Sequence, residues 1–168
     1  MTTAIVLAMH GAPPNDFPPS EMAEMLGLHG RLEHAAEHER AALERRYAPL
    51  EARMRDWPRT AQNDPFYAAS QELVAQLARA AGLPVLVGFN EFCAPCLDDA
   101  LDQAAGGVER VVVVTPMMTR GGEHAEADIP AALDRARARH PSVEFVYAWP
   151  FVPADVARFL ADQVERFL

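Results

Sequence analysis

The chain has 168 residues, half of them hydrophobic, and its 15 Lys+Arg against 24 Asp+Glu give a formal net charge of −9. This length is typical of one soluble domain with a continuous core. The acidic balance argues against nucleic-acid binding, which needs a basic face, and it favours the approach of divalent cations.

Two residue types are scarce enough to exclude whole classes of chemistry. Every residue in the Lys+Arg total is Arg, and without an amine on a flexible stem the chain offers no P-loop, Schiff-base or pyridoxal-phosphate chemistry. Only three serines occur, none within a G-x-S-x-G elbow, which argues against that type of hydrolase.

Three features of the sequence predict the cellular compartment of the protein. No apolar run approaches the roughly 18–20 residues that span a bilayer, and no positive side chain precedes Arg31, as a secretory signal would require. The two cysteines, Cys93 and Cys96, lie too close together to form a disulfide framework. We expect a cytoplasmic protein without membrane contact.

The first predicted element is a strand at residues 4–9, a continuous apolar run that ends at His10. A helical segment follows at residues 21–57, rich in Ala, Glu and Arg, and Pro49 predicts a bend within this helix or helix pair. Its apolar stripe consists of Ala36, Leu43, Tyr47, Leu50, Met54 and Trp57. We interpret residues 20–62 as a long helical insertion after the first strand, within a single domain of residues 1–168.

The remaining elements alternate between helix and strand. Helices are predicted at 66–80, 97–105, 128–140 and 154–167, and strands at 85–89, 111–115 and 143–148. Asp64 as N-cap, Pro65 at the first helical position and Gly82 as the stop define the first of these helices. The pattern predicts an α/β fold, a three-layer α/β/α arrangement around a mainly parallel four-stranded sheet with helices on both faces.

Three polar residues follow three of the predicted strands. His10 ends the first strand, Glu91 follows the second, and His124 lies in the loop after the third. Ligands of parallel sheets bind at the carboxyl ends of the strands, where two imidazoles and a carboxylate can hold a divalent metal or accept protons. Each residue also has an ordinary interpretation: a hydrogen-bonded histidine, or a glutamate that caps the next helix.

Three motifs in the second half of the chain resemble one known family. They are Phe-Asn-Glu-Phe-Cys-Ala-Pro at residues 89–95, an apolar strand ending at Pro116, and Gly-Glu-His-Ala-Glu-Ala-Asp-Ile-Pro at residues 122–130. Together they resemble the CbiX-type sirohydrochlorin chelatases, class II tetrapyrrole metal chelatases related to ferrochelatases. The similarity covers about residues 66–150 and, more loosely, the first strand with His10.

The resemblance implies a lyase-class chelatase that inserts Co²⁺ or Fe²⁺ into sirohydrochlorin or a related tetrapyrrole, in cobalamin or siroheme synthesis. It places His10 and His124 as metal ligands or proton acceptors and Glu91 as an assisting acid. The metal is then a substrate, and no organic cofactor is implied. Because chelatases of this class have two similar lobes and this chain resembles one, a homodimer is also implied.

One departure supports an alternative function. The family usually has Gly-His-Gly-Ser at the first strand, whereas this chain has Met-His-Gly-Ala at residues 9–12. A non-catalytic carrier or regulator that binds a metal or a tetrapyrrole on a chelatase fold is therefore the second hypothesis.

Further residues are candidates for secondary roles. Phe92, Met117 and Met118 could lie against a flat macrocycle or simply pack at strand ends, and Arg120 could meet a substrate carboxylate or remain exposed. Cys93 and Cys96 form a single C-x-x-C, which favours small buried residues at a helix start over metal ligands.

Two further histidines have helical i, i+4 spacing. His34 and His38 could take part in weak metal delivery, but they fall outside the apolar stripe of the insertion. We expect them to be solvated.

Overall fold

The computed structural model describes the backbone of residues 1–168 and the side chains of residues 1–32 and 34–168. The strands are β1 (Thr3–Met9), β2 (Val85–Phe89), β3 (Arg110–Val114) and β4 (Glu144–Tyr147). The α-helices are α1 (Pro19–Glu33), α2 (Glu37–Arg55), α3 (Pro65–Ala81), α4 (Leu97–Ala105), α5 (Ile129–Arg139) and α6 (Pro153–Glu165), and a π-helical turn, η1 (His124–Asp128), leads into α5.

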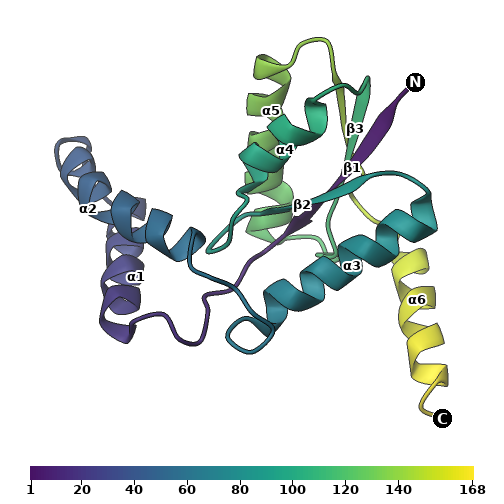
Figure 1. The fold of residues 1–168 in the computed structure, drawn as a ribbon, viewed down its shortest axis with the longest axis horizontal. Coiled ribbons are helices and arrows are strands. Elements are labelled where there is room, and N and C mark those ends of the chain that lie inside the picture. The colour runs from purple at the N-terminus through teal and green to yellow at the C-terminus, as the bar shows by residue number, and fades with distance from the viewer.

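The four strands form one parallel sheet in the order β2-β1-β3-β4 (Figure 1). The central strand β1 pairs with both of its neighbours, Ile5 lying beside Val85 on one side and Val112 on the other. Apolar side chains cover both of its faces, which is why this strand is a continuous hydrophobic run.

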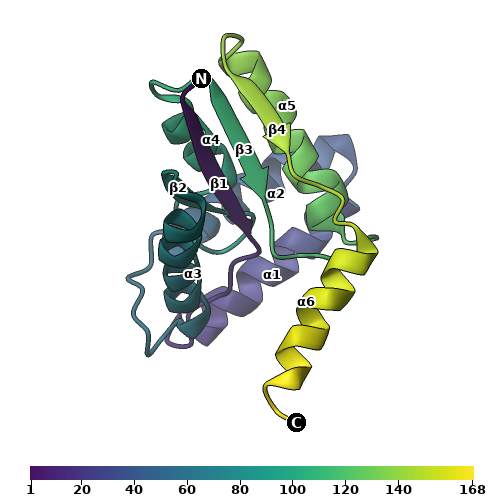
Figure 2. The same cartoon turned by 90° about the vertical axis from the view of Figure 1, so that its right-hand side faces the viewer.

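Helices lie on both faces of the sheet, so the predicted three-layer architecture is confirmed (Figure 2). One face packs against α4 and α5 and forms the larger part of the core, with Val6, Leu101, Val113 and Leu133 buried there. The other face packs against α3 over β1 and β2, and Val114 of β3 packs at the margin of this second cluster. The sheet is therefore covered unevenly.

The start and end of α3 agree with the sequence prediction. The Asp64 carboxylate accepts a hydrogen bond from the Tyr67 amide at 2.8 Å, Pro65 is the first helical residue, and Gly82 adopts the left-handed conformation after the last turn. These residues satisfy the free backbone groups at both ends of the helix.

The insertion is a pair of helices, but its division differs from the prediction. The chain turns at residues 34–36, where the His34 amide bonds back to the Arg31 carbonyl, while Pro49 lies inside α2. The bend predicted at Pro49 is therefore not where the two helices separate. Phe17, Met25 and Met54 form a small core between this pair and the sheet edge.

The last helix stands apart from the rest of the molecule. α6 continues away from the sheet after β4, and none of its residues is buried (Figures 1 and 2). Within the described residues, no helix combines the length and hydropathy that a membrane span requires.

Candidate metal and substrate site

The three polar residues predicted to converge do so at the carboxyl edge of the sheet. His10 directly follows β1, Glu91 lies in the loop after β2, and His124 is the first residue of η1, beyond β3. One ligand atom of each lies within 4.8 Å of those of the other two. The imidazole rings of His10 and His124 meet edge to face, with centroids 4.4 Å apart.

Hydrogen bonds fix the orientation of both imidazoles. Nδ1 of His10 lies 2.8 Å from the Gly11 carbonyl oxygen, and Nδ1 of His124 lies 2.6 Å from a carboxylate oxygen of Asp128. Because carbonyl and carboxylate oxygens only accept hydrogen bonds, both Nδ1 atoms are assigned the proton. Each Nε2 then keeps a free lone pair, and the Asp128–His124 pair is the carboxylate–imidazole arrangement common behind metal ligands.

Two imidazoles and one carboxylate suit Co²⁺ and Fe²⁺ and leave further coordination positions for a substrate. Bonds of about 2.0–2.2 Å to one tetrahedral ion hold two ligand atoms roughly 3.5 Å apart, so these three atoms, which lie within 4.8 Å of one another, would move closer together around an ion. All three side chains are partly accessible, with His10 46% and Glu91 32% exposed. Small rotations of these side chains provide that closure.

The loops that carry His10 and Glu91 are in direct backbone contact. The Glu91 amide donates to the His10 carbonyl at 2.9 Å, and the Asn90 amide donates to the Met9 carbonyl at 2.9 Å. Gly11 has φ +99°, and a Cβ there would lie 1.9 Å from the Glu91 carbonyl oxygen. Only glycine permits this approach, so Gly11 sets the distance between the two ligand loops.

A buried arginine joins these loops to the insertion. The Arg59 guanidinium pairs with Asp64 and donates to four carbonyls, those of Ala12, Met54, Trp57 and Phe92. Its side chain is 5% exposed and that of Asp64 is 1% exposed. One cation therefore connects the His10 loop, the Glu91 loop and the end of α2.

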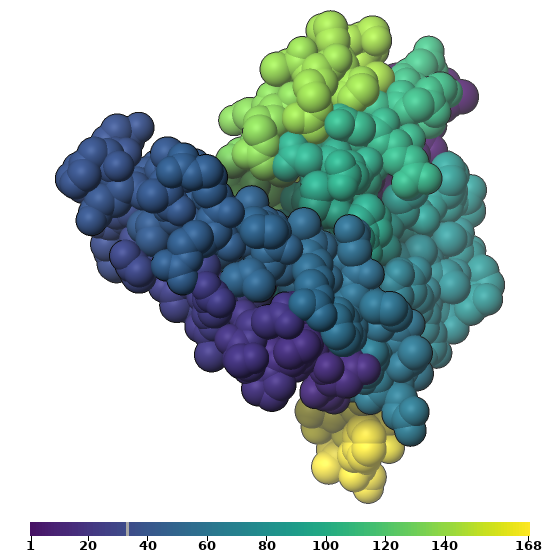
Figure 3. Space-filling view, turned by 60° about the vertical axis from the view of Figure 1, so that its left-hand side comes forward, coloured from purple at the N-terminus to yellow at the C-terminus, as the bar shows by residue number. Residues whose placement is uncertain are grey.

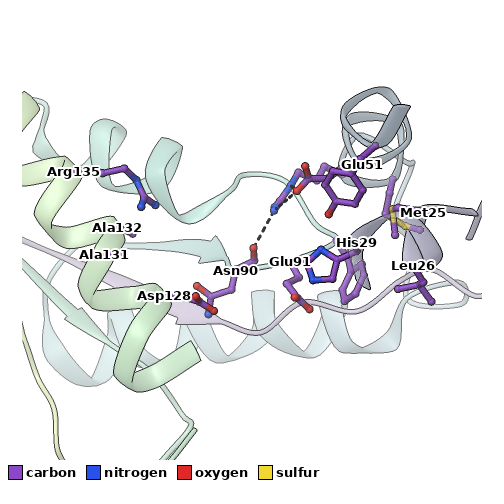
Figure 4. A pocket seen from close by; sticks show the side chains of 14 residues that line it. Met25, Leu26, His29, Glu51, Asn90, Glu91, Asp128, Ala131, Ala132 and Arg135 are labelled. Atoms are coloured by element: carbon purple, nitrogen blue, oxygen red, sulfur yellow. Dashed lines mark hydrogen bonds and ion pairs between the residues drawn. The ribbon is translucent and has the colours of Figure 1, made fainter. Parts of the chain in front are cut away.

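A cavity of about 310 Å³ lies beside the three polar residues, between the insertion and α5 (Figure 4). Figure 3 shows the corresponding notch between the insertion and α5. The insertion lines the cavity with Met25, Leu26, His29, Tyr47, Glu51, Met54 and Arg55. Glu91 and Asp128, the hydrogen-bond partner of His124, line it as well, whereas His10 and His124 do not.

Two polar side chains of the cavity have unusual properties: the pKa of the Tyr47 hydroxyl is raised, and the Asn90 side-chain amide lacks a hydrogen-bond partner among the described residues. Burial raises the pKa of the Tyr47 hydroxyl to about 12, so the phenol remains a hydrogen-bond donor even in alkaline solution. The side-chain Nδ2 of Asn90 is buried and has no hydrogen-bond partner among the described residues. Asn90 and Tyr47 both line the cavity, and both side chains carry a hydrogen-bond donor.

The candidate substrate contacts divide into two groups. Phe92 lines the cavity in a left-handed conformation, φ +59°, and stacks at 6.5 Å on the His10 ring. Met117 instead packs against the main core, Met118 is half-buried, and Arg120 is 72% exposed and paired with Glu126 at 3.1 Å. None of these three belongs to the cavity lining.

The insertion residues of the cavity were not predicted as site residues. The apolar stripe does include Tyr47 and Met54, but a stripe at helical spacing equally predicts core packing. Tyr47 also lines the cavity because of where the insertion folds back, and the sequence pattern does not predict that position.

The other candidate residues, the two cysteines and the two histidines of the insertion, are either at least partly buried in the fold or exposed to solvent. Burial raises the pKa values of Cys93 and Cys96, which keeps both as thiols, and the Cys96 sulfur accepts the Asp99 amide at the start of α4. His34 and His38 are exposed, as expected.

Comparison with known proteins identifies the family. The family model CbiX matches residues 61–166. The chain belongs to the CbiX family. This match contains Glu91 and His124, whereas His10 and nearly all of the insertion lie outside it.

Individual relatives are more distant. A sirohydrochlorin cobaltochelatase from Priestia megaterium is 37% identical over 62 residues, which are 37% of this chain and only 20% of that protein. A CbiX protein structure from Marinobacter aquaeolei VT8 covers 98% of both chains with a TM-score of 0.53 at 18% identity, a similarity of fold. The structure of the chelatase SirB from Bacillus subtilis subspecies spizizenii in complex with cobalt gives a TM-score of 0.44 at 18% identity, covering 89% of this chain and 44% of that one.

Proposed function

We propose that this protein inserts a divalent metal, Co²⁺ or Fe²⁺, into sirohydrochlorin or a closely related tetrapyrrole. The observation behind the proposal is the convergence of His10, Glu91 and His124 beside a cavity with apolar and aromatic walls. Family membership supports the same class of reaction, because the matched relative is a sirohydrochlorin cobaltochelatase.

The reaction requires the site to bind an ion and remove two protons. The metal enters the macrocycle as two pyrrole N–H bonds break, and the two protons leave as the metal–nitrogen bonds form. The Nε2 lone pairs of His10 and His124 bind the ion or accept these protons, and Glu91 balances charge during the exchange.

The macrocycle is proposed to lie between the insertion and the loop after β2. Phe92 and Met25 offer apolar surface for a flat ring, and the unpaired Asn90 amide and the protonated Tyr47 hydroxyl offer donors to its carboxylates. On this proposal the insertion acts as a wall of the site. A homodimer is a further part of the proposal.

Anaerobic absorption spectroscopy tests the function. The purified full chain is mixed with sirohydrochlorin and Co²⁺, then Fe²⁺, and loss of the free-base spectrum is compared with the rate without protein. Many turnovers per chain are expected. A spectral change that stops at one equivalent would favour the carrier alternative, and no change with sirohydrochlorin or a porphyrin would contradict both.

A further inference from the structure

The turn that carries His124 is wider than an α-helical turn. The Ile129 amide donates to the His124 carbonyl, five residues earlier, and this bond closes the π-helical turn η1. Turns of this kind are rare, and they occur mostly as single turns next to α-helical residues. The hydrogen-bond register of η1 therefore sets the position of His124 relative to α5.

This register leaves the Ala125 carbonyl without a backbone donor. The Ile129 amide is already used by His124, and the next residue in the π register is Pro130, which has no amide hydrogen. Ala125 is 1% exposed, so its carbonyl has little access to water. A buried carbonyl without a donor destabilises the conformation that creates it.

The missing donor comes from a different element of the sheet. The hydroxyl of Tyr147, the last residue of β4, donates to the Ala125 carbonyl at 2.9 Å. The Tyr147 ring packs against the main core and stacks on Trp149 with centroids 6.1 Å apart, so its position is fixed. Burial raises the pKa of this hydroxyl to about 12, and it remains a donor even in alkaline solution.

Without this hydroxyl, neither helical register satisfies the turn. In the π register the Ala125 carbonyl lacks a donor, and in the α register the Pro130 ring meets the Glu126 carbonyl, four residues earlier. A change of register by one residue also rotates His124 by about 100° around the helix axis and moves it about 1.5 Å along that axis. The imidazole would then leave the cluster of ligand atoms.

We propose that Tyr147 is a positioning residue for the candidate metal site: its hydroxyl stabilises the π register of η1 and thereby holds His124 beside His10 and Glu91. Tyr147 acts through the backbone and does not belong to the cavity lining. The cluster depends on this placement, because the His124 ring lies 4.4 Å from that of His10. The consequence for metal insertion rests on the proposed function, whereas the placement of His124 does not.

Hydrogen exchange measured by NMR and calorimetric titration with Co²⁺, both on the full chain, test this role. Tyr147→Phe removes only the hydroxyl, and we expect the Ile129 amide to exchange at least about 10-fold faster while the amides of β1 keep their rates. Co²⁺ affinity is expected to fall about 10-fold, the lower range for loss of a group that orients a metal ligand. The control Tyr67→Phe removes a hydroxyl on the opposite face of the sheet and should change neither quantity.

Three outcomes would overturn the proposal. Unchanged exchange at Ile129 would show that the turn does not depend on the hydroxyl, and equally faster exchange throughout β1 would show only a general loss of stability. Faster exchange at Ile129 with unchanged Co²⁺ affinity would show that the turn does not place His124. Loss of Co²⁺ affinity in Tyr147→Phe, in a protein that never metallates sirohydrochlorin, would contradict the proposed function and support the role of Tyr147.

Discussion

His10 and His124 each use Nδ1 for a hydrogen bond within the protein and offer Nε2 to the site. Alanine at either position removes one ion ligand or proton acceptor, and we expect metal insertion to fall at least about 100-fold, the lower range for loss of a general base. The thermal midpoint should stay nearly unchanged because both side chains are partly accessible. Initial rates of metal insertion measure the effect.

The matched control is His38→Ala, which removes an exposed histidine from the insertion. It should retain full activity. Normal turnover in both His10→Ala and His124→Ala would refute the site assignment.

Asp128 is hydrogen-bonded to His124, and on the proposed function it orients that imidazole without contacting the metal. In Asp128→Asn, the amide no longer favours the Nδ1–H form of the imidazole, and we expect Co²⁺ affinity to fall about 10- to 100-fold. Isothermal titration calorimetry with Co²⁺ alone measures this without turnover. Asp134→Asn changes an exposed acid on α5 and should bind normally; equal affinity in the two variants would exclude the positioning role.

At the scale of elements, Arg59 is the point where three segments meet. Arg59→Met leaves the buried Asp64 charge and four backbone carbonyls without their donor, so we expect a loss of about 3–5 kcal/mol in the free energy of unfolding. Urea denaturation measures this, with exposed Arg79→Ala as the control. A change below about 1 kcal/mol would mean that the loops hold each other without the arginine.

The elements could be predicted from the sequence to different extents. The strands and α3 were predictable because buried parallel strands are continuous apolar runs and because Asp64, Pro65 and Gly82 have local effects. The turn at residues 34–36 was missed because Pro49, the strongest local signal, is accommodated inside α2. The amphipathic pattern of α6 predicts a helix. It does not predict where that helix lies, because its position depends on tertiary packing.

The residues of the site also differ in how far the sequence predicts their positions. His10, Glu91 and His124 were predictable because strand order in a parallel sheet brings strand ends together whatever the loops do. Tyr47 and Arg55 reach the cavity because the end of α2 is tied to the loop after β2, where Arg55 donates to the Asn90 carbonyl and Arg59 donates to the Phe92 carbonyl. Contacts that depend on the path of an insertion have no periodic signal in the sequence.

At the scale of the whole molecule, acid unfolding is expected to depend on the contact between α4 and α5. Hydrogen bonds from Arg135, and then from Arg139, hold the pKa of Asp98 below its usual 3.8. The folded state therefore gains stability from this carboxylate above about pH 4 and loses it as pH falls through the lowered value.

Asp98→Asn should lower the thermal midpoint at pH 7 and make its decline in acid shallower. Calorimetric scans from about pH 2.5 to pH 7 measure both effects. Asp134→Asn, an acid on the exposed side of α5, serves as the reference. A parallel shift of the whole curve for Asp98→Asn would contradict the proposed linkage.

On the proposed function, metal binding by these loops would also change the stability of the protein itself. His10, Glu91 and His124 come from distant parts of the sequence and meet only after β1, β2 and β3 have paired. Unfolded chains cannot offer this set of ligands, so any ion bound there raises the free energy of unfolding by mass action. In a metal-starved cell a chain with such a site would unfold more often and be degraded sooner, so its abundance would follow the supply of the ion proposed to bind there.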